Sequence, residues 1–292
     1  MLVQETINQP DVMLNTYASI DDKIKQMYQA GTLKQLPLEG RRRKAQLSVS
    51  EIITMLVMGA WRGLVDKAKL YYFMRTYHLS EFPGLPCYSK FVAATNRVMR
   101  ELAGLLAQII GQNRQAQGGY PLVFQDSTAV PVCKVARAKQ HKTFRKLAHK
   151  SKTGSGWYYG FKLHAQCDPE GRLCGFRLTA ANTDDRKLLE PLTQWMDKGI
   201  VVGDKGYLSQ QVAYDLGSRN VQLITGTRQN MKKLATPFQL ACLQARHRIE
   251  EVFAFLKCCF GLIRSTHRAD YALPLHFMVC LLAYSLYKLL IA

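Results

Sequence analysis

The sequence lacks the cysteine patterns of a zinc finger or of a disulfide framework. Its eight cysteines form no C-x-x-C pair and show no zinc-ligand spacing. Scattered thiols of this kind are typical of a reducing compartment and exclude a small disulfide-stapled secreted domain. The opening residues, MLVQETINQPDVML, also lack the basic and then apolar order of a secretory signal. We therefore expect a cytoplasmic protein.

Acidic residues are scarce. The 292 residues include 21 Asp and Glu against 40 Lys and Arg, which gives a formal net charge of +19. The positive charges repel one another, and such an excess favours binding to a polyanion, for which nucleic acid is the leading candidate. An acidic membrane surface or an RNA scaffold would satisfy the same charge. Because 48% of the residues are hydrophobic, the chain can bury a sizeable core, and global disorder is excluded.

One apolar segment, LPLHFMVCLLAYSLYKLLIA at 273–292, is nearly long enough to cross a bilayer. It contains His276 and Lys288, and Pro274 lies near its start. Polar and charged residues inside the segment favour a buried terminal helix over a membrane span. We therefore expect no membrane partner.

Residues 1–115 are expected to be mostly helical. The stretch LSVSEIITMLVMGAW places Ser48 and Glu51 at the spacing of a capping box, ahead of apolar residues at helical intervals. Two further helices are expected around 67–77 and 88–110, separated by the helix-breaking run SEFPGLPCYS. Short helices of this kind form either a helix-turn-helix or a plain bundle packed on the next domain, and both arrangements are open on the sequence.

The composition changes at the Gly- and Gln-rich linker GQNRQAQGG, and residues 116–292 are expected to form a second domain. GFKLHAQCD and RLCGFRLTA alternate as strands do, and the turn at 168–171 joins them as a hairpin. Strands then alternate with helices, which indicates an α/β domain with a mixed β-sheet flanked by helices. The other expected elements are strands at 122–124, 200–204 and 221–225 and helices at 185–196, 208–216 and 238–260.

Two aspartates are expected at the carboxyl ends of strands, Asp126 after LVFQ and Asp204 after IVVG. Ligands gather at that edge of an open α/β sheet. Two carboxylates held close together repel each other unless a divalent cation lies between them. Ligand sets made only of oxygen atoms favour Mg²⁺ or Mn²⁺. These ions serve phosphoryl transfer, often as a pair. Each aspartate taken alone fits a turn or helix cap equally well. Asp184 and Asp185, expected to cap the next helix, are the main rivals for the site.

A third carboxylate can come from the stretch RHRIEEVFAFLK. On the expected helix, Arg246, Glu250 and Lys257 share one face, whereas Glu251 points about 100° away. Glu250 can therefore complete the metal site while the two cations reach phosphates. The alternative is an exposed ion pair between Arg246 and Glu250 with no wider role.

Other residues are candidates for contact with nucleic acid. The segment 134–152 holds eight Lys or Arg in nineteen residues, a density above that of an ordinary solvated face. It is expected to lie along DNA, and the aromatic run at 157–159 either stacks on a displaced base or belongs to the core. Lys162 and His164 share one face of a strand, and Lys205 follows the second aspartate. The residues expected to contact DNA are Arg246, Lys257, Lys205, Lys162, His164, Lys142, Arg145, Lys146 and Lys150.

Together these residues resemble a known family: the DDE transposases of bacterial insertion sequences, most closely the group numbered nine-eight-two. The resemblance rests on FQDST at Asp126, WYYGFKLHAQCDPEGRLCGFRLTAANTDDR, VVGDKGY at Asp204 and RHRIEEVFAFLK. The order and spacing of these motifs agree with the family over nearly the whole chain, and most specifically from about residue 122 onward.

The resemblance implies a ribonuclease-H-like catalytic domain. Its acids, Asp126, Asp204 and Glu250, would bind two divalent ions, Mg²⁺ or Mn²⁺, and the enzyme would cut and then join DNA strands at the ends of an element. The R-x3-E-x6-K spacing of the related signature is present in RHRIEEVFAFLK, whereas Leu243 stands where that signature has Tyr. The phosphate contact of that tyrosine is therefore left unassigned.

The resemblance also implies partners. Residues 1–115 would bind the terminal inverted repeats as double-stranded DNA, and the protein would act on target DNA as a homodimer or higher oligomer, in the cytoplasm and at the nucleoid. Two alternatives stay open on the sequence. One is a domesticated or inactive relative that binds DNA without cutting it, and the other is a nuclease of the same fold that nicks and never joins.

Overall fold

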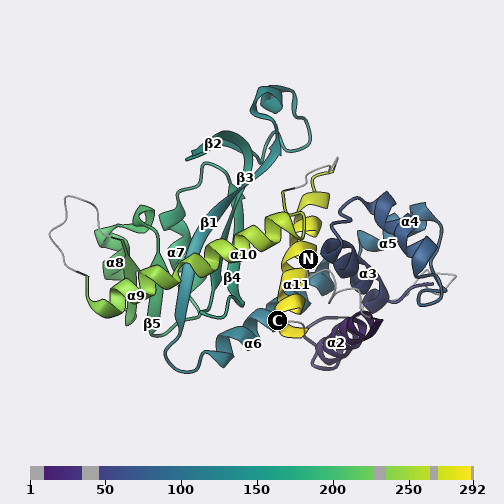
Figure 1. Cartoon of the computed structure of the whole chain (residues 1–292), viewed down its shortest axis with the longest axis horizontal. Helices are drawn as coiled ribbons and strands as arrows, with labels where there is room; N and C mark the ends of the chain where they lie inside the picture. The colour runs from purple at the N-terminus through teal and green to yellow at the C-terminus, as the bar shows by residue number, and fades with distance from the viewer. Residues whose placement is uncertain (1–9, 35–45, 227–234, 264–268, 291–292) are drawn as a thin grey trace. The chain divides into compact units, whose positions relative to one another are not determined.

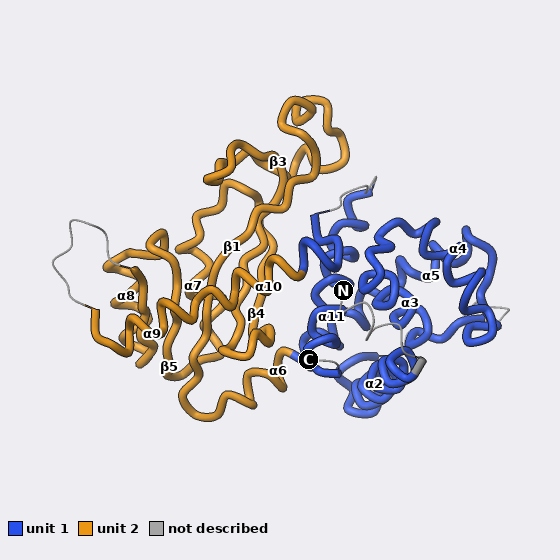
Figure 2. Tube along the Cα trace, viewed as in Figure 1, with its two compact units in different colours: residues 1–109, 256–292 blue, residues 110–255 orange. Residues whose placement is uncertain are grey.

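The computed structural model describes residues 10–34, 46–226, 235–263 and 269–290 (Figure 1). The chain forms two compact units (Figure 2). Unit 1 consists of Met1–Ile109 and Leu256–Ala292, and unit 2 consists of Ile110–Phe255. This division differs from the expected boundary at 115/116, because the last part of the chain packs with the N-terminal helices.

Unit 1 is helical, and its helix α3 (Val49–Trp61) starts at the expected capping box. Ser48 Oγ accepts the N–H of Glu51 at 3.1 Å, and the Glu51 carboxylate accepts the N–H of Ser48 at 2.6 Å. Nearly every residue of α3 is buried. The other helices are α2 (Pro10–Gln29), α4 (Lys67–Tyr77), α5 (Tyr88–Thr95), α6 (Met99–Ala116), which continues into unit 2, and α11 (Ala272–Leu290).

Helix α11 is the buried terminal helix that the sequence predicts for the apolar tail. It packs on α3, and Trp61 Nε1 donates a hydrogen bond to the backbone oxygen of Ala283 at 2.8 Å. Within the described ranges, α11 is the one helix long and apolar enough to cross a membrane, and 67% of that apolar stretch is buried inside the protein. The apolar character of α11 therefore serves the core of unit 1.

The single helix expected over 88–110 is instead two helices, α5 and α6. Thr95 Oγ1 donates a hydrogen bond to the carbonyl oxygen of Val92 at 2.8 Å, and α5 ends at Thr95, with Asn96 as its C-cap. A hydroxyl that bonds back to a helix carbonyl favours an end or a bend at that point.

Unit 2 contains a mixed sheet, as the sequence predicts, and it has six strands because β2, which was not expected, joins the five expected ones. Its strands are β1 (Leu122–Cys133), β2 (His149–Thr153), β3 (Gly156–Cys167), β4 (Leu173–Ala180), β5 (Gly199–Gly203) and β6 (Val221–Thr225). The order is β2-β3-β1-β5-β6, and β4 pairs with β3 as the expected hairpin. β1 runs antiparallel to β3 and parallel to β5, and β6 runs parallel to β5. β1 is therefore the strand where the antiparallel and parallel parts of the sheet meet.

Helices flank this sheet. α7 packs on β4, α8 on β6, and α9 on β5 and β6, while α10 follows α9 across the sheet (Figure 1). The bounds are η1 (Val135–Gln140), η2 (Asp185–Leu188), α7 (Leu189–Thr193), η3 (Lys205–Tyr207), α8 (Gln210–Gly217), α9 (Pro237–Ala245) and α10 (His247–Cys258). Their apolar side chains and those of the strands form the core, which contains Val123, Cys174, Leu189, Met196, Val201, Tyr207, Leu216 and Val221.

Two expected elements of unit 2 have different bounds in the structure. β1 continues to Cys133, so Asp126 lies inside a strand and not at its end, because β1 gains a long antiparallel partner in β3. The helix expected over 238–260 is divided into α9 and α10, with Arg246 as the one turn residue between them. The backbone of Arg246 keeps helical angles, with φ −58° and ψ −23°, so the helical spacing of RHRIEEVFAFLK survives the division.

Candidate active site

The strand register brings Asp126, inside β1, beside Asp204, which directly follows β5. Phe124 pairs with Val202 in the parallel ladder between β1 and β5, and each aspartate lies two residues beyond that pair. Neighbouring strands are about 4.8 Å apart, so the two residues are close neighbours. Asp204 leaves β5 and opens η3, where its carboxylate accepts the N–H of Lys205 at 2.7 Å. The turn therefore holds Asp204 in an exposed position.

Helix α10 adds a third acid, and Arg246 connects it to the first. Arg246 Nη1 donates to Asp126 Oδ2 at 3.0 Å, and Nη2 donates to Glu250 Oε1 at 2.7 Å. Glu251 is directed elsewhere, since it pairs with Arg248 and with His247, the latter at 3.3 Å. The two glutamates of RHRIEEVFAFLK therefore have different surroundings, as the helical periodicity predicts.

The charges of the three acids act on one another. Burial raises the pKa of Asp126, and the negative charges of Asp204 and Glu250 raise it further. The N–H of Ser127 and the Arg246 guanidinium lower the pKa of Asp126 without cancelling that rise. Three carboxylates thus share one neighbourhood in which Arg246 supplies a positive charge. Such an arrangement of acids is costly for folding and is typical of a functional site.

Comparison with known proteins identifies the family. Residues 117–270, more than half of the chain, match the family model described as "Transposase DDE domain". The chain belongs to the DDE transposase domain family. It is therefore a DDE transposase enzyme, and this agrees with the DDE resemblance of its four motifs. No curated protein matches it in sequence.

Solved structures show the fold of this transposase. The cryo-EM structure of a piggyBac transposase synaptic complex with hairpin DNA is similar with a TM-score of 0.52 at 10% identity, over 98% of this chain and 73% of that one. This similarity concerns the fold, and the expected ribonuclease-H-like mixed sheet with a helical N-terminal region is confirmed. The Mos1 mariner paired end complex with Mn also matches, at 10% identity over 90% of this chain and 86% of that one, with a TM-score of 0.25.

The donor set of the transposase fits a hard divalent cation. Asp126, Asp204 and Glu250 offer only carboxylate oxygens, which Mg²⁺ and Mn²⁺ prefer, and DDE transposases use divalent metals. In the described part of the chain, however, no three His, Cys, Asp or Glu side chains converge closely enough to hold one ion. The fork of Arg246 lies between two of the three acids instead. The three acids thus have the chemistry to hold such an ion, and Arg246 pairs with two of them.

Lys162 and His164 lie on the other face of the sheet from Asp126. Asp126 is opposite Ala165 in the antiparallel ladder, whereas His164 is opposite Ser127, and successive residues of a strand face opposite sides. Lys162 Nζ donates to Asp185 Oδ1 at 2.8 Å, and Ser127 Oγ donates to Asp185 Oδ2 at 3.1 Å. These contacts tie the residue after Asp126 to the connection that follows β4.

His164 is fully buried in this polar cluster. Its Nε2 lies 2.9 Å from Thr179 Oγ1, and its Nδ1 lies 3.6 Å from Asp185 Oδ1. Burial lowers the pKa of His164 to about 4, although the charge of Asp185 opposes this shift. His164 is therefore neutral at physiological pH and has no surface to offer to DNA. Sequence reasoning missed Ser127 and Asp185 as a pair, although both lie in motifs of the resemblance.

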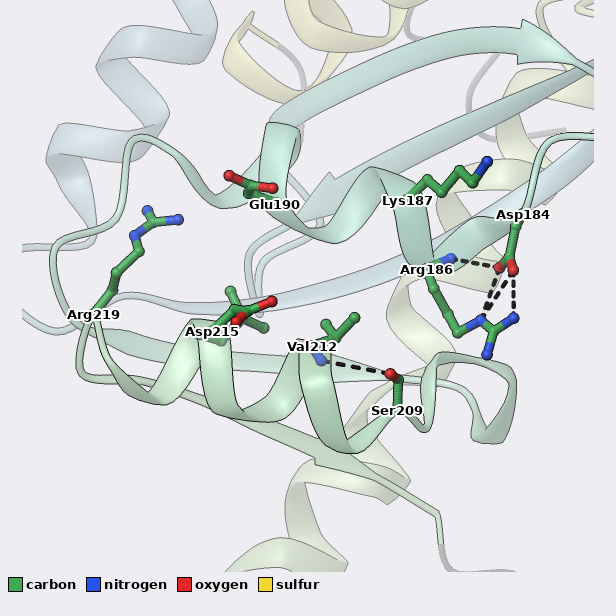
Figure 3. A pocket seen from close by; sticks show the side chains of 9 residues that line it. Asp184, Arg186, Lys187, Glu190, Ser209, Val212, Asp215 and Arg219 are labelled. Carbon is green, nitrogen blue, oxygen red and sulfur yellow. Dashed lines mark hydrogen bonds and ion pairs between the residues drawn. The ribbon is translucent and has the colours of Figure 1, made fainter.

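Asp184 has the capping role expected of it, and it lines a pocket separate from the acids. Its carboxylate accepts the N–H of Arg186 at 3.0 Å and pairs with the Arg186 side chain, which lowers the pKa of Asp184 to about 2. Figure 3 shows this pair at one end of a cavity of about 410 Å³ between η2 and α8, with Asp215 and Arg219 at the other. None of Asp126, Asp204 and Glu250 lines the cavity, so it belongs to a different part of unit 2.

The basic segment 134–152 and the strand after it form an exposed arm, which we call the basic hairpin (residues 134–157). It contains η1, β2 and the start of β3, and projects from the sheet in Figure 1. Trp157 at its end is 63% exposed, whereas Tyr158 and Tyr159 are each 7% exposed and belong to the core. The cations expected to contact DNA, Lys142, Arg145, Lys146 and Lys150, are all exposed.

The remaining candidates occupy different places. Lys205 is exposed beside Asp204 in the turn after β5. Lys257 lies on the last turn of α10, in the part of that helix that belongs to unit 1. Leu243, which stands in place of the signature tyrosine, lies on α9 and is partly buried.

Proposed function

We propose that this transposase belongs to the insertion-sequence group numbered nine-eight-two, and that it cuts DNA at the ends of an element and joins those ends to target DNA. Asp126, Asp204 and Glu250 are its catalytic acids and metal ligands. The observation that supports the proposal is that β1, the turn after β5 and α10 bring these acids into one neighbourhood, with two of them on one arginine. Metal-dependent phosphoryl transfer uses such carboxylates as metal ligands.

In this proposal the three acids act together as ligands of the metal ions. Mg²⁺ or Mn²⁺, as two ions, would neutralise the scissile phosphate and activate the attacking water or 3′-hydroxyl. Asp126 is held by the centre of the sheet, Asp204 by its turn and Glu250 by α10, so the three ligands come from elements fixed by the core. Arg246 and Lys205, next to these acids, are suited to hold the phosphates of the strand being cut.

The basic hairpin is the DNA-binding surface that we assign to unit 2. No acidic residue occurs in the sequence between Lys134 and Trp157, so phosphates meet no opposing charge from this segment. Lys152 is opposite Trp157 in the ladder between β2 and β3, which sets a cation beside an exposed aromatic ring. Cations with an aromatic surface are typical of sites that bind phosphates and stack on bases.

Other parts of the proposal rest on the family resemblance. The helical N-terminal region, residues 1–115, would recognise the terminal inverted repeats, and the enzyme would act as a homodimer or higher oligomer on DNA. Transposition needs an active site at each of two element ends, which is the reason to expect at least two copies. A place in the cytoplasm at the nucleoid agrees with the net charge of +19.

The test uses DNA that contains the coding region with its natural flanks. Wild-type protein is expected to cleave at the flanks with Mg²⁺ or Mn²⁺ and to join the freed ends to a second plasmid, whereas Asp204→Asn binds the same DNA and does neither. Cleavage without joining would favour the nuclease alternative. Specific binding without cleavage by the wild type would favour the inactive relative, and either result would contradict the proposal.

A further inference from the structure

Arg246 occupies an unusual position for a cation expected to contact DNA. It is the turn residue between α9 and α10, and only 20% of its side chain is exposed. One nitrogen of its fork is bonded to Asp126 and another to Glu250, at 3.0 Å and 2.7 Å. We call this arrangement the Arg246 bridge (Asp126–Arg246–Glu250). It joins the central strand of the sheet to helix α10 through one side chain.

The Arg246 bridge and a divalent cation would compete for the same two carboxylates, Asp126 and Glu250. The guanidinium is a permanent positive charge that satisfies Asp126 and Glu250 through directed hydrogen bonds. A metal ion at these acids would lie close to that charge and be repelled by it. While the bridge is intact, the charge of Arg246 therefore opposes the metal ion for which the acids are suited.

The two ends of the bridge differ in exposure. The Asp126 side chain is 23% exposed, whereas the Glu250 side chain is 57% exposed. The fork of Arg246 is thus accessible from the Glu250 side, where a phosphate can approach. A DNA phosphate offers the same geometry of paired oxygens as a carboxylate, so it can replace Glu250 as the partner of Arg246.

We propose that the Arg246 bridge makes metal binding depend on DNA. Without DNA, Arg246 holds Asp126 and Glu250 together and lowers the affinity of the site for Mg²⁺ or Mn²⁺. When a DNA phosphate replaces Glu250 as a partner of the guanidinium, the Glu250 carboxylate is released toward the metal, and the phosphate offsets the positive charge of Arg246. This inference rests on the proposed function. Because coupling between two ligands is reciprocal, the metal also strengthens DNA binding through the same residue.

The helix supplies a matched control for the bridge. Arg248 pairs with Glu251 on the same helix, and its side chain is 42% exposed. Substitution of Arg248 removes the same charge from the protein, in a pair that contains none of the three active-site acids. A difference between Arg246→Gln and Arg248→Gln therefore reports the bridge and not the net charge.

The first experiment measures the binding of Mn²⁺ to the DNA-free full-length protein by electron paramagnetic resonance. Arg246→Gln is expected to bind Mn²⁺ about tenfold more tightly than the wild type, because one nearby positive charge is gone. Arg248→Gln and Arg246→Lys, which keep the charge at 246, are expected to stay close to the wild type. Equal or weaker Mn²⁺ binding by Arg246→Gln would overturn the inference.

The second experiment adds a blunt DNA duplex of about 20 base pairs and repeats the titration. The duplex is expected to tighten Mn²⁺ binding to the wild type and to Arg248→Gln about tenfold, and to have little effect on Arg246→Gln. The wild-type titration tests the inference even if Arg246→Gln folds poorly, because the absence of any DNA effect on Mn²⁺ binding by the wild type would also overturn it. If the wild type cleaves DNA with metal but DNA does not change its Mn²⁺ affinity, this inference fails and the proposed function stands. If the wild type shows neither cleavage nor a DNA effect on Mn²⁺ affinity, the proposed function fails as well.

Discussion

At the scale of single residues, burial decides which groups of unit 2 carry charge. Burial raises the pKa of Asp126 on the face of the sheet toward α10, and it lowers the pKa of His164 to about 4 on the other face. Both shifts disfavour the charged form. Arg246 offsets this cost for Asp126, whereas His164 avoids it by remaining neutral. Asp126 therefore has a cationic partner on its face of the sheet, whereas His164 on the opposite face stays neutral.

The low pKa of His164 predicts a loss of stability in mild acid. The pKa of an unfolded histidine is about 6.5, so as the pH falls from 6.5 toward 4 the unfolded chain takes up a proton that the folded chain refuses. Stability that is present above pH 6.5 is therefore lost across this window. We expect His164→Gln to lose about 1–2 kcal/mol less free energy of unfolding than the wild type between pH 7 and pH 5.

Urea unfolding at the two pH values measures this difference. His149→Gln serves as the control, because His149 is exposed on β2, and it should lose as much stability as the wild type. Equal pH dependence of His164→Gln and the wild type would show that His164 is charged in the folded protein.

At the scale of elements, the basic hairpin presents the Lys and Arg side chains of one segment of sequence on one exposed part of unit 2. Its exposed cations lie on β2 and in the loops beside it, so that several can contact one DNA duplex. Each phosphate contact that is lost should reduce the slope of log K against log salt by about 0.9. Lys146→Gln with Lys150→Gln is therefore expected to weaken DNA binding and to reduce that slope by roughly 2.

The matched control for the hairpin removes two cations elsewhere in unit 2. Lys187 and Lys198 are exposed outside the hairpin, so Lys187→Gln with Lys198→Gln changes the net charge equally. Fluorescence anisotropy of labelled duplex DNA over a range of KCl gives both slopes. If the two double variants lose the same slope, binding follows the total charge and the hairpin has no special role.

Elements with local signals could be predicted from the sequence. The capping box at Ser48 and the hairpin of β3 and β4 are both present, because caps, turns and alternation act over a few residues. The interior position of Asp126 and the turn at Arg246 were not predicted, since each depends on a partner distant in sequence. For the candidate site, periodicity distinguished Glu250 from Glu251, but it could not reveal that Arg246 joins Asp126 to Glu250.

At the scale of the whole molecule, unit 1 contains both the first and the last part of the chain, and unit 2 is formed by the residues between them. Residues 256–292 complete unit 1, and α11 is the main element of this last part. Such long-range packing leaves no local mark in the sequence, which is why the expected boundary assigned α11 to the catalytic domain. The apolar composition of α11 did predict its burial.

The burial of α11 predicts how the stability of the protein responds to substitution. Leu281 is 0% exposed, and Leu281→Ala is expected to cost about 2–5 kcal/mol of the free energy of unfolding. Leu289, on the same helix, is 49% exposed, and Leu289→Ala should cost less than about 1 kcal/mol. Denaturant unfolding followed by circular dichroism tests both. Similar small costs for the two variants would contradict a core role for α11.

At the same scale, the two adjacent glutamates of α10 provide the most direct test of the proposed active site. Glu250→Gln and Glu251→Gln remove the same charge from neighbouring positions, and only Glu250 is joined to Asp126 through Arg246. Cleavage of flank-containing DNA in Mn²⁺ is to be measured for both, with DNA binding checked by gel shift. We predict that Glu250→Gln binds DNA but cleaves it at least roughly a hundredfold more slowly, while Glu251→Gln cleaves as the wild type does. Retained cleavage by Glu250→Gln with loss in Glu251→Gln would contradict the assignment of the active site.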